Sequence, residues 1–120
     1  MFKEILKEVV DQAEGSIASV IMDSDGIPLE HYVRGSEQTP DVEAVGAEFS
    51  VVLNQVRSAA EMLEVGGASE IAIRAERLTT IIRVLTEEHF VALTLHPTGN
   101  FGKARYLLRR QSSRLSEALV

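Results

Sequence analysis

Residues 17–33 read I-A-S-V-I-M-D-S-D-G-I-P-L-E-H-Y-V: an apolar run, a polar bend and a second strand-like run. Gly26 can adopt a positive φ at little cost, and the side chains of Asp23 and Asp25 can hydrogen-bond to the backbone of the bend. The stretch therefore predicts a β-hairpin. Pro28 cannot donate a hydrogen bond to a neighbouring strand, which indicates that the second strand lies at the edge of a sheet.

A second stretch, residues 97–105 (P-T-G-N-F-G-K-A-R), follows an apolar run and predicts the start of a helix capped by Asn100. The Asp-Ser-Asp-Gly bend at Asp23 lacks the Gly and Glu spacing of a calcium loop. The segment around Lys103 lacks the first Gly and the Ser or Thr of a phosphate loop. Neither stretch supplies a nucleophile or a metal cage, so together they favour a protein that binds other proteins.

The composition is that of a single globular domain spanning residues 1–120, with 45% hydrophobic residues and no Cys. The absence of Cys excludes disulfides, thiolate zinc sites and cysteine catalysis. The three histidines, His31, His89 and His96, have no ligand partner at helical spacing, so we expect no metal or cofactor. With no signal peptide or membrane-length apolar run, we expect a soluble cytoplasmic domain. With no nucleophile or metal motif, we expect no catalysis of its own.

Basic residues gather late in an otherwise acidic chain of net charge −6. Five of them lie in one segment: Lys103, Arg105, Arg109, Arg110 and Arg114. One interpretation is a nucleic-acid-binding helix, which would show steep salt dependence. The interpretation that we prefer pairs Arg105 and Arg109 with acids of the first helix, such as Glu4, Glu8 or Asp11. We therefore expect no nucleic-acid partner and no membrane insertion.

Apolar periodicity predicts the elements α-ββ-α-βββ-α. Their expected bounds are residues 2–14, 16–23, 27–33, 40–64, 70–75, 78–85, 89–95 and 100–119. Short connections between the last three strands favour an antiparallel meander. The fold class is therefore α/β (α+β), with three amphipathic helices that cover both faces of a five-stranded antiparallel sheet.

The long helix carries two apolar stripes, whereas a helix on the surface of one domain needs only one. The first is an ordinary core stripe through Phe49 and Leu53. The second consists of small and apolar residues on another side of the helix: Ala44, Ala47, Val51, Ser58 and Met62. Two stripes indicate two partners, the sheet of the same chain and something else. The alternative is one broad core face.

The hairpin V-I-M-D-S-D-G-I-P-L, the Ala-rich long helix and the helix start G-N-F-G-K-A-R, in this order, resemble the roadblock (dynein light chain) family over about residues 3–119. The resemblance implies a sheet with the long helix on one face and the terminal helices on the other. It also implies homodimers that align the long helices and join the sheets at the third strand. The implied dimer interface is Ala44, Ala47, Val51, Ser58, Met62, Ile71 and Ile73.

The resemblance also implies a function, because stand-alone prokaryotic members commonly work with small Ras-like GTPases. The gliding-motility type activates GTP hydrolysis by repositioning switch loops, without an inserted arginine. In this chain the implied docking surface is Glu43, Ser50, Asn54, Arg57 and Glu61, unless these form a plain solvated helix face. The alternative function is a dimeric, non-catalytic scaffold or adaptor in a larger protein assembly, as in eukaryotic relatives.

Overall fold

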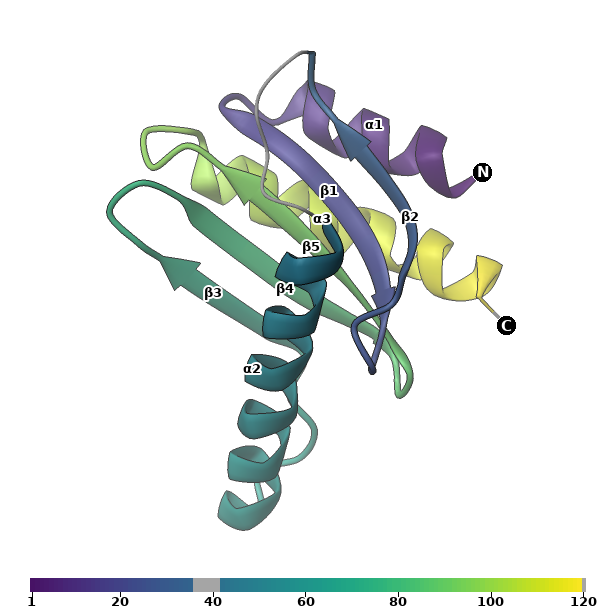
Figure 1. The fold of residues 1–120 in the computed structure, drawn as a ribbon, viewed down its shortest axis with the longest axis vertical. Helices are drawn as coiled ribbons and strands as arrows, with labels where there is room; N and C mark the ends of the chain where they lie inside the picture. Colours follow the sequence, from purple (N-terminus) through teal and green to yellow (C-terminus); the bar gives the residue numbers. More distant parts are fainter. Residues whose placement is uncertain (36–41, 120) are drawn as a thin grey trace.

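Figure 1 shows the fold of the computed structural model, which describes residues 1–35 and 42–119. The elements run helix, two strands, helix, three strands, helix, as predicted. Their bounds are α1 Phe2–Gln12, β1 Ser16–Asp23, β2 Pro28–Val33, α2 Val42–Leu63, β3 Glu70–Arg74, β4 Thr79–Thr86, β5 His89–Leu95 and α3 Phe101–Ala118. The predicted start of the long helix, at Pro40, lies outside the described residues.

The strands form one antiparallel sheet in the order β2-β1-β5-β4-β3 (Figure 1). β1 is an inner strand, bonded to its hairpin partner β2 on one side and to the distant β5 on the other, with Val20 opposite Ala92. The register of β1 and β2 shifts between Ile21 and Met22, beside Pro28, whose missing N–H weakens the ladder there. β2 and β3 are the two edges, so the prediction from Pro28 is confirmed.

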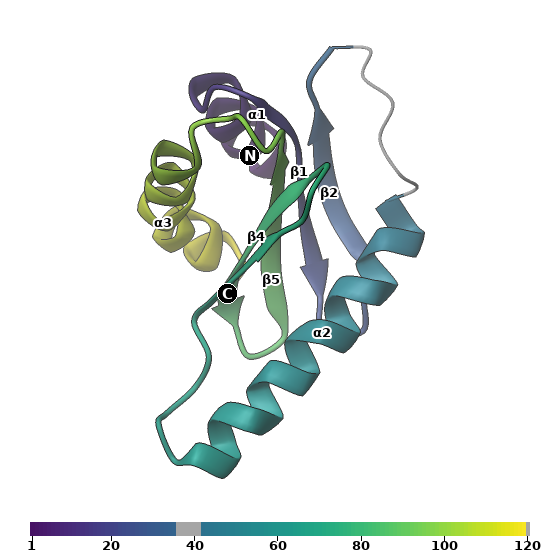
Figure 2. The ribbon, with the colours of Figure 1, turned by 90° about the vertical axis from the view of Figure 1, so that its left-hand side faces the viewer.

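Helices α1 and α3 cover one face of the sheet and α2 covers the other, as Figure 2 shows. Successive side chains of β1 point to opposite faces of the sheet, so this strand contributes to both core layers. Ile21 packs in the layer under α1 and α3, whereas Val20 and Met22 pack in the layer under α2. The core layer between the sheet and helices α1 and α3 is the larger of the two. The α2 layer is built on Val20, Met22, Leu53, Ile82, Phe90 and Ala92. The predicted fold class is confirmed, and α2 is held by the smaller of two cores.

The β1–β2 hairpin closes through the side chain of Asp23. Its Oδ1 accepts hydrogen bonds from the backbone N–H of Asp25 at 2.9 Å and of Ile27 at 3.0 Å. Gly26 has a φ of +85°, in the left-handed region that favours glycine. The predicted hairpin is confirmed, and the carboxylate of Asp23 is occupied by the turn.

Helix α3 begins at the predicted cap. The side chain of Asn100 accepts a hydrogen bond from the backbone N–H of Lys103 at 3.1 Å. This bond satisfies one of the N–H groups that the first turn of a helix leaves without a partner. The inward side of α3 buries five residues, Ala104, Leu107, Leu108, Gln111 and Leu115.

We expect Asn100→Ala to lower the free energy of unfolding by about 1 kcal/mol, because one helix N–H loses its acceptor. Urea unfolding at a fixed protein concentration measures this. Asn100→Ser keeps a side-chain oxygen at the cap and should recover most of the loss. An equal loss for both variants would contradict a capping role.

Within residues 1–35 and 42–119, no helix is both long and apolar enough to span a membrane.

Candidate protein-binding surface

Helix α2 faces the sheet with its predicted core stripe. Leu53 is 1% exposed, and Phe49 packs against the α2-side core. The lower end of the helix runs past the sheet (Figure 1). There Leu63 and Val65 are each 71% exposed. The sheet therefore covers only part of the apolar surface that α2 offers.

Most of the second stripe of α2 faces away from the sheet, and Ala44 at its start also borders the space between the helix and the sheet. We call this stripe the outer strip: Ala44, Ala47, Val51, Ser58 and Met62, all of which are exposed. Val51 is 53% exposed and Met62 is 85% exposed. Their positions lie nearly opposite Leu53 around the helix. They are therefore not part of a broad core face.

The hairpin and α2 approach each other through two glycines. A Cβ on Gly46 would lie 2.8 Å from the carbonyl oxygen of Gly26 and 2.7 Å from the sulfur of Met22. A Cβ on Gly26 would lie 2.9 Å from the carbonyl oxygen of Gly46. The sequence reasoning missed Gly46. A glycine inside a helix costs about 1 kcal/mol relative to alanine, so its presence there was a signal of close packing.

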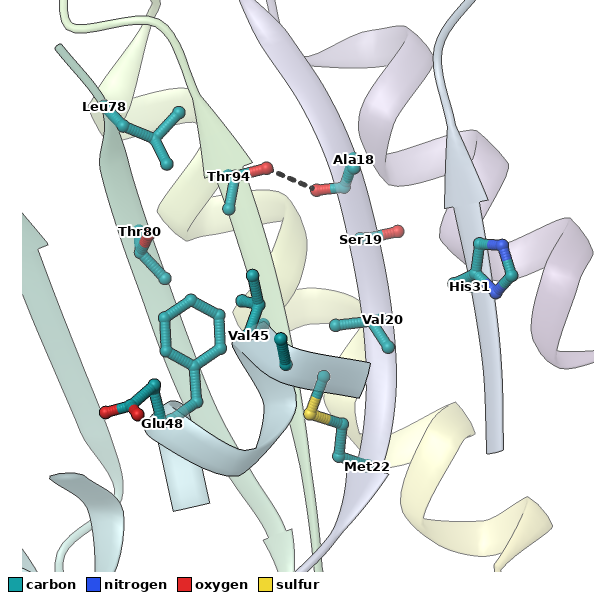
Figure 3. Close-up of a pocket in the computed structure, with 13 residues that line it drawn as sticks. Ala18, Ser19, Val20, Met22, His31, Val45, Glu48, Leu78, Thr80 and Thr94 are labelled. Carbon is teal, nitrogen blue, oxygen red and sulfur yellow. Dashed lines mark hydrogen bonds between the residues drawn. The ribbon is translucent and has the colours of Figure 1, made fainter. Parts of the chain in front are cut away.

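The described part of α2 leaves an apolar cavity of about 360 Å³ between its first turns and the sheet. Figure 3 shows Val45, Val20 and Met22 around it, with Glu48 and His31 toward its sides. Thr94 on the cavity wall donates a hydrogen bond to the carbonyl oxygen of Ala18 at 3.4 Å. The described side chains of α2 do not fill this space, so the contact at Gly46 is a close approach of the helix to the hairpin beside an open cavity.

Strand β3 is an open edge, bonded to β4 on one side only among the described strands. Ile71 and Ile73 lie on it, but their side chains are half-buried against the α2-side core. What this edge offers a partner is therefore its backbone N–H and C=O groups. An interface here would include a strand-to-strand ladder through the backbone around Ile71 and Ile73.

The residues of the predicted docking surface lie on one flank of α2 but differ in accessibility. Asn54 and Glu61 are exposed. Ser50 is only 6% exposed, and its hydroxyl donates a hydrogen bond to the carbonyl oxygen of Ala47 at 2.8 Å. Burial removes Ser50 from the accessible set. Glu43 lies in the first turn of α2, and its side chain is outside the described part of the structure.

Arg57 is half-buried and held by the β4–β5 turn. Its guanidinium donates hydrogen bonds to the carbonyl oxygens of Glu87 at 3.1 Å and Thr86 at 3.4 Å. These two bonds fix the charge beside the sheet. The side chain of Arg57 is therefore fixed against the β4–β5 turn and does not project freely from the protein surface.

Arg57 and Glu61 line a shallow hollow of about 640 Å³ at the end of α2, which we call the acidic hollow. Its full lining is Arg57, Glu61, Glu64, Gly66, Gly67, Ala68, Val84 and Glu87. Three glutamates and one arginine are among these residues, so the hollow carries net negative charge. Glu64 and Glu87 were not in the predicted docking set, because only the fold brings the end of α2 beside the β4–β5 turn.

The expected pairing of Arg105 and Arg109 with acids of α1 is wrong. Arg105 pairs with Glu70 on β3 at 2.5 Å. Arg114 is the residue that reaches α1, 3.6 Å from Glu8. The reason is the placement of α3: it packs over β4, next to the edge strand β3, so Arg105 reaches Glu70, while Arg114 farther along the helix reaches α1.

The ionisable groups with displaced pKa values lie on α1. Lys7 donates a hydrogen bond to Asp11 at 2.6 Å, which lowers the pKa of Asp11 and raises the pKa of Lys7. This pair is exposed and lies on the face of the sheet that α2 does not cover. Among the described residues, no group of three His, Cys, Asp or Glu side chains could hold a metal ion.

The chain is thus a small α/β protein with an exposed apolar helix face and an open edge strand, two features typical of association surfaces. No family model matches the chain, and no curated protein matches it. Among solved structures it is similar to MglC from Myxococcus xanthus, at 34% identity over 98% of each chain and a TM-score of 0.71. With this likeness, the chain belongs to the roadblock family.

Two further structures share the fold at lower identity. One is an MglB with a tetrameric arrangement, at 18% identity, covering 95% of this chain and 84% of that one, with a TM-score of 0.88. The other is a Roadblock/LC7 domain from Streptomyces avermitilis, at 13% identity, covering 98% and 96%, with a TM-score of 0.87. The predicted family and fold are confirmed: the chain is a stand-alone roadblock-type protein.

Proposed function

We propose that this chain is a homodimer that binds a small Ras-like GTPase and activates its GTP hydrolysis. The observation that carries the proposal is the outer strip of α2, which is exposed and nearly opposite the side that the sheet covers. An apolar strip of this kind on a small protein marks an association surface. The GTPase as the partner is what the resemblance to gliding-motility roadblock proteins implies.

The proposed dimer pairs two outer strips about a twofold axis. In such an interface the same patch serves both subunits, so a strip of Ala47, Val51 and Met62 can meet its own copy. The small side chains of Ala44 and Ala47 let two helices approach closely. The open edge of β3 can pair with its copy and remove two unpaired edges at once.

The proposed GTPase surface is the flank of α2 beside that seam, made of Asn54, Arg57 and Glu61 and continued by the acidic hollow. It also includes Glu43 as a prediction from the sequence. Because both bonds of Arg57 go to backbone carbonyls, we propose that activation positions the switch loops of the GTPase and inserts no arginine from Arg57. The three carboxylates of the hollow would meet a basic surface of the partner.

GTP turnover by the small GTPases of the same cell, with and without this protein, tests the proposal. It is paired with binding of the protein to their GTP-loaded and GDP-loaded forms. Faster turnover with preference for the GTP form supports an activator. Binding without faster turnover supports an adaptor instead, and no binding to any of them contradicts a GTPase partner.

For the GTPase that binds, we expect Asn54→Ala with Glu61→Ala to raise the Kd about tenfold, which is about 1.4 kcal/mol of binding free energy. Both side chains are exposed, so the mass of the protein in solution should not change. The matched control is Glu48→Ala, which removes an exposed carboxylate from the other flank of the same helix. An equal effect of the control would show that only charge, and not this flank, matters.

A further inference from the structure

We propose that the exposed face of α3 is a docking surface for an acidic segment of a partner protein. The surface is an arginine ridge, which we define as Lys103, Tyr106, Arg109, Arg110 and Arg114. All five side chains are exposed, and Tyr106 is 58% exposed. The ridge lies on the face of the sheet opposite α2 (Figure 2), so it does not depend on the proposed GTPase surface.

The ridge concentrates positive charge in a chain of net charge −6. Helix α3 carries five basic residues and one acidic residue, Glu117. Arg110 and Arg114 are four positions apart, as are Arg105 and Arg109. Like charges at this spacing repel each other along one side of a helix. Opposite charge brought by a partner would remove this repulsion.

The ion pairs within the chain leave most of the positive charge of the ridge without an acidic partner. Arg105, beside the ridge, pairs with Glu70, and Arg114, at its end, lies 3.6 Å from Glu8. In the described part of the chain, no ion pair reaches Lys103, Arg109 or Arg110. These three cations are therefore available to a partner.

Carboxylates of a protein fit the ridge by chemistry and by size. The guanidinium fork of arginine binds a carboxylate through two parallel hydrogen bonds, which favours Arg over Lys in interfaces. Tyr106 between the cations adds apolar contact, and Tyr and Arg are enriched where interface energy concentrates. From Lys103 to Arg114 the ridge runs about 16 Å along the helix. This is about three turns of an acidic helix, or a shorter extended segment.

Nucleic acids and membranes fit the ridge less well. A nucleic acid is longer than the ridge, so its phosphates would extend past it toward acidic residues such as Glu70 and Glu117. The protein is acidic as a whole, and these phosphates would be repelled. A membrane-surface helix needs apolar side chains on its exposed side. Among the described residues of α3, Tyr106 is the single large apolar side chain that is exposed, which is too little for a membrane-binding face. We therefore infer that the partner of the ridge is an acidic protein segment.

Fluorescence anisotropy of a labelled decaglutamate peptide, titrated with the full chain at low salt, tests the proposal. We expect saturable binding that weakens as salt rises. Arg109→Glu with Arg110→Glu should raise the Kd at least about tenfold. The control is Lys3→Glu with Lys7→Glu, which changes the net charge equally at two exposed positions of α1 and should change the Kd less than about twofold.

Three results would overturn the proposal. The first is no binding of decaglutamate by the unmodified chain. The second is equal weakening by the α1 control, which would mean that only net charge matters. The third is tighter binding of a ten-nucleotide single-stranded RNA, or of vesicles with anionic lipid, which would assign the ridge to another class of partner. Circular dichroism of each variant confirms that α3 is still folded, since both ridge substitutions are at exposed positions.

Discussion

A chain that carries Ala47→Glu and Val51→Glu is expected to be a folded monomer. In the proposed dimer both positions face their copies, so four carboxylates would have to be desolvated together, which is strongly unfavourable for unpaired charges. In the single chain both positions are exposed. The substitutions should therefore leave the fold intact, and only the association should be lost.

Light scattering after size exclusion measures this directly. The unmodified chain should have twice 13.2 kDa, and the double variant should have 13.2 kDa with an unchanged circular dichroism spectrum. Gln12→Glu with Ser113→Glu is the matched control, because it adds the same charge at exposed positions of α1 and α3. A double variant that still has twice the chain mass would rule out the outer strip as the seam.

Gly46→Val is expected to lower the free energy of unfolding by about 1–3 kcal/mol, the usual cost of forcing extra side-chain atoms into a packed contact. The first added carbon would already lie 2.8 Å from the backbone of Gly26, which cannot rotate away as a side chain can. Relief requires α2 to lift from the hairpin. Because α2 carries the outer strip, the variant should also dimerise less tightly.

Thermal unfolding at one protein concentration measures the loss, which should appear as a Tm lower by several degrees. Gly67→Val is the control. A Cβ on Gly67 meets nothing within 4 Å, and this glycine is not among those with a positive φ. We expect that substitution to change stability by less than about 0.5 kcal/mol. Equal losses at the two glycines would show that the contact with the hairpin contributes little.

Local sequence patterns predicted the order of helices and strands, and the family resemblance predicted which helices cover which face of the sheet. The apolar run of β1 spans eight residues and the helical spacing in α1 and α2 spans more, so single exceptions do not obscure them. Pro28 predicted an edge strand because its missing N–H excludes an inner position. Element bounds shifted by one or two residues, as at β4, because the Glu76–Arg77 bend has no glycine or asparagine to mark it.

The surface was predicted only in part, because it depends on what lies beside each element. Helical spacing predicted the exposure of Ala47 and Val51 correctly. It did not predict that Ser50 is buried, nor that the β4–β5 turn holds Arg57, since both depend on how α2 tilts over the sheet. The same holds for Arg105, whose partner Glu70 lies 35 positions away along the chain. Contacts at that distance carry no local signal.

The place of β1 inside the sheet also sets the order in which the protein can be completed during synthesis. The Thr94 hydroxyl and the Ala18 carbonyl oxygen that it contacts are 76 positions apart. At roughly 5–20 residues per second, the ribosome needs several seconds to supply β5 after β1 has emerged. During that time one edge of an apolar strand has no partner strand. Residues 16–23 of the nascent chain thus remain open to wrong strand pairing until β5 is available.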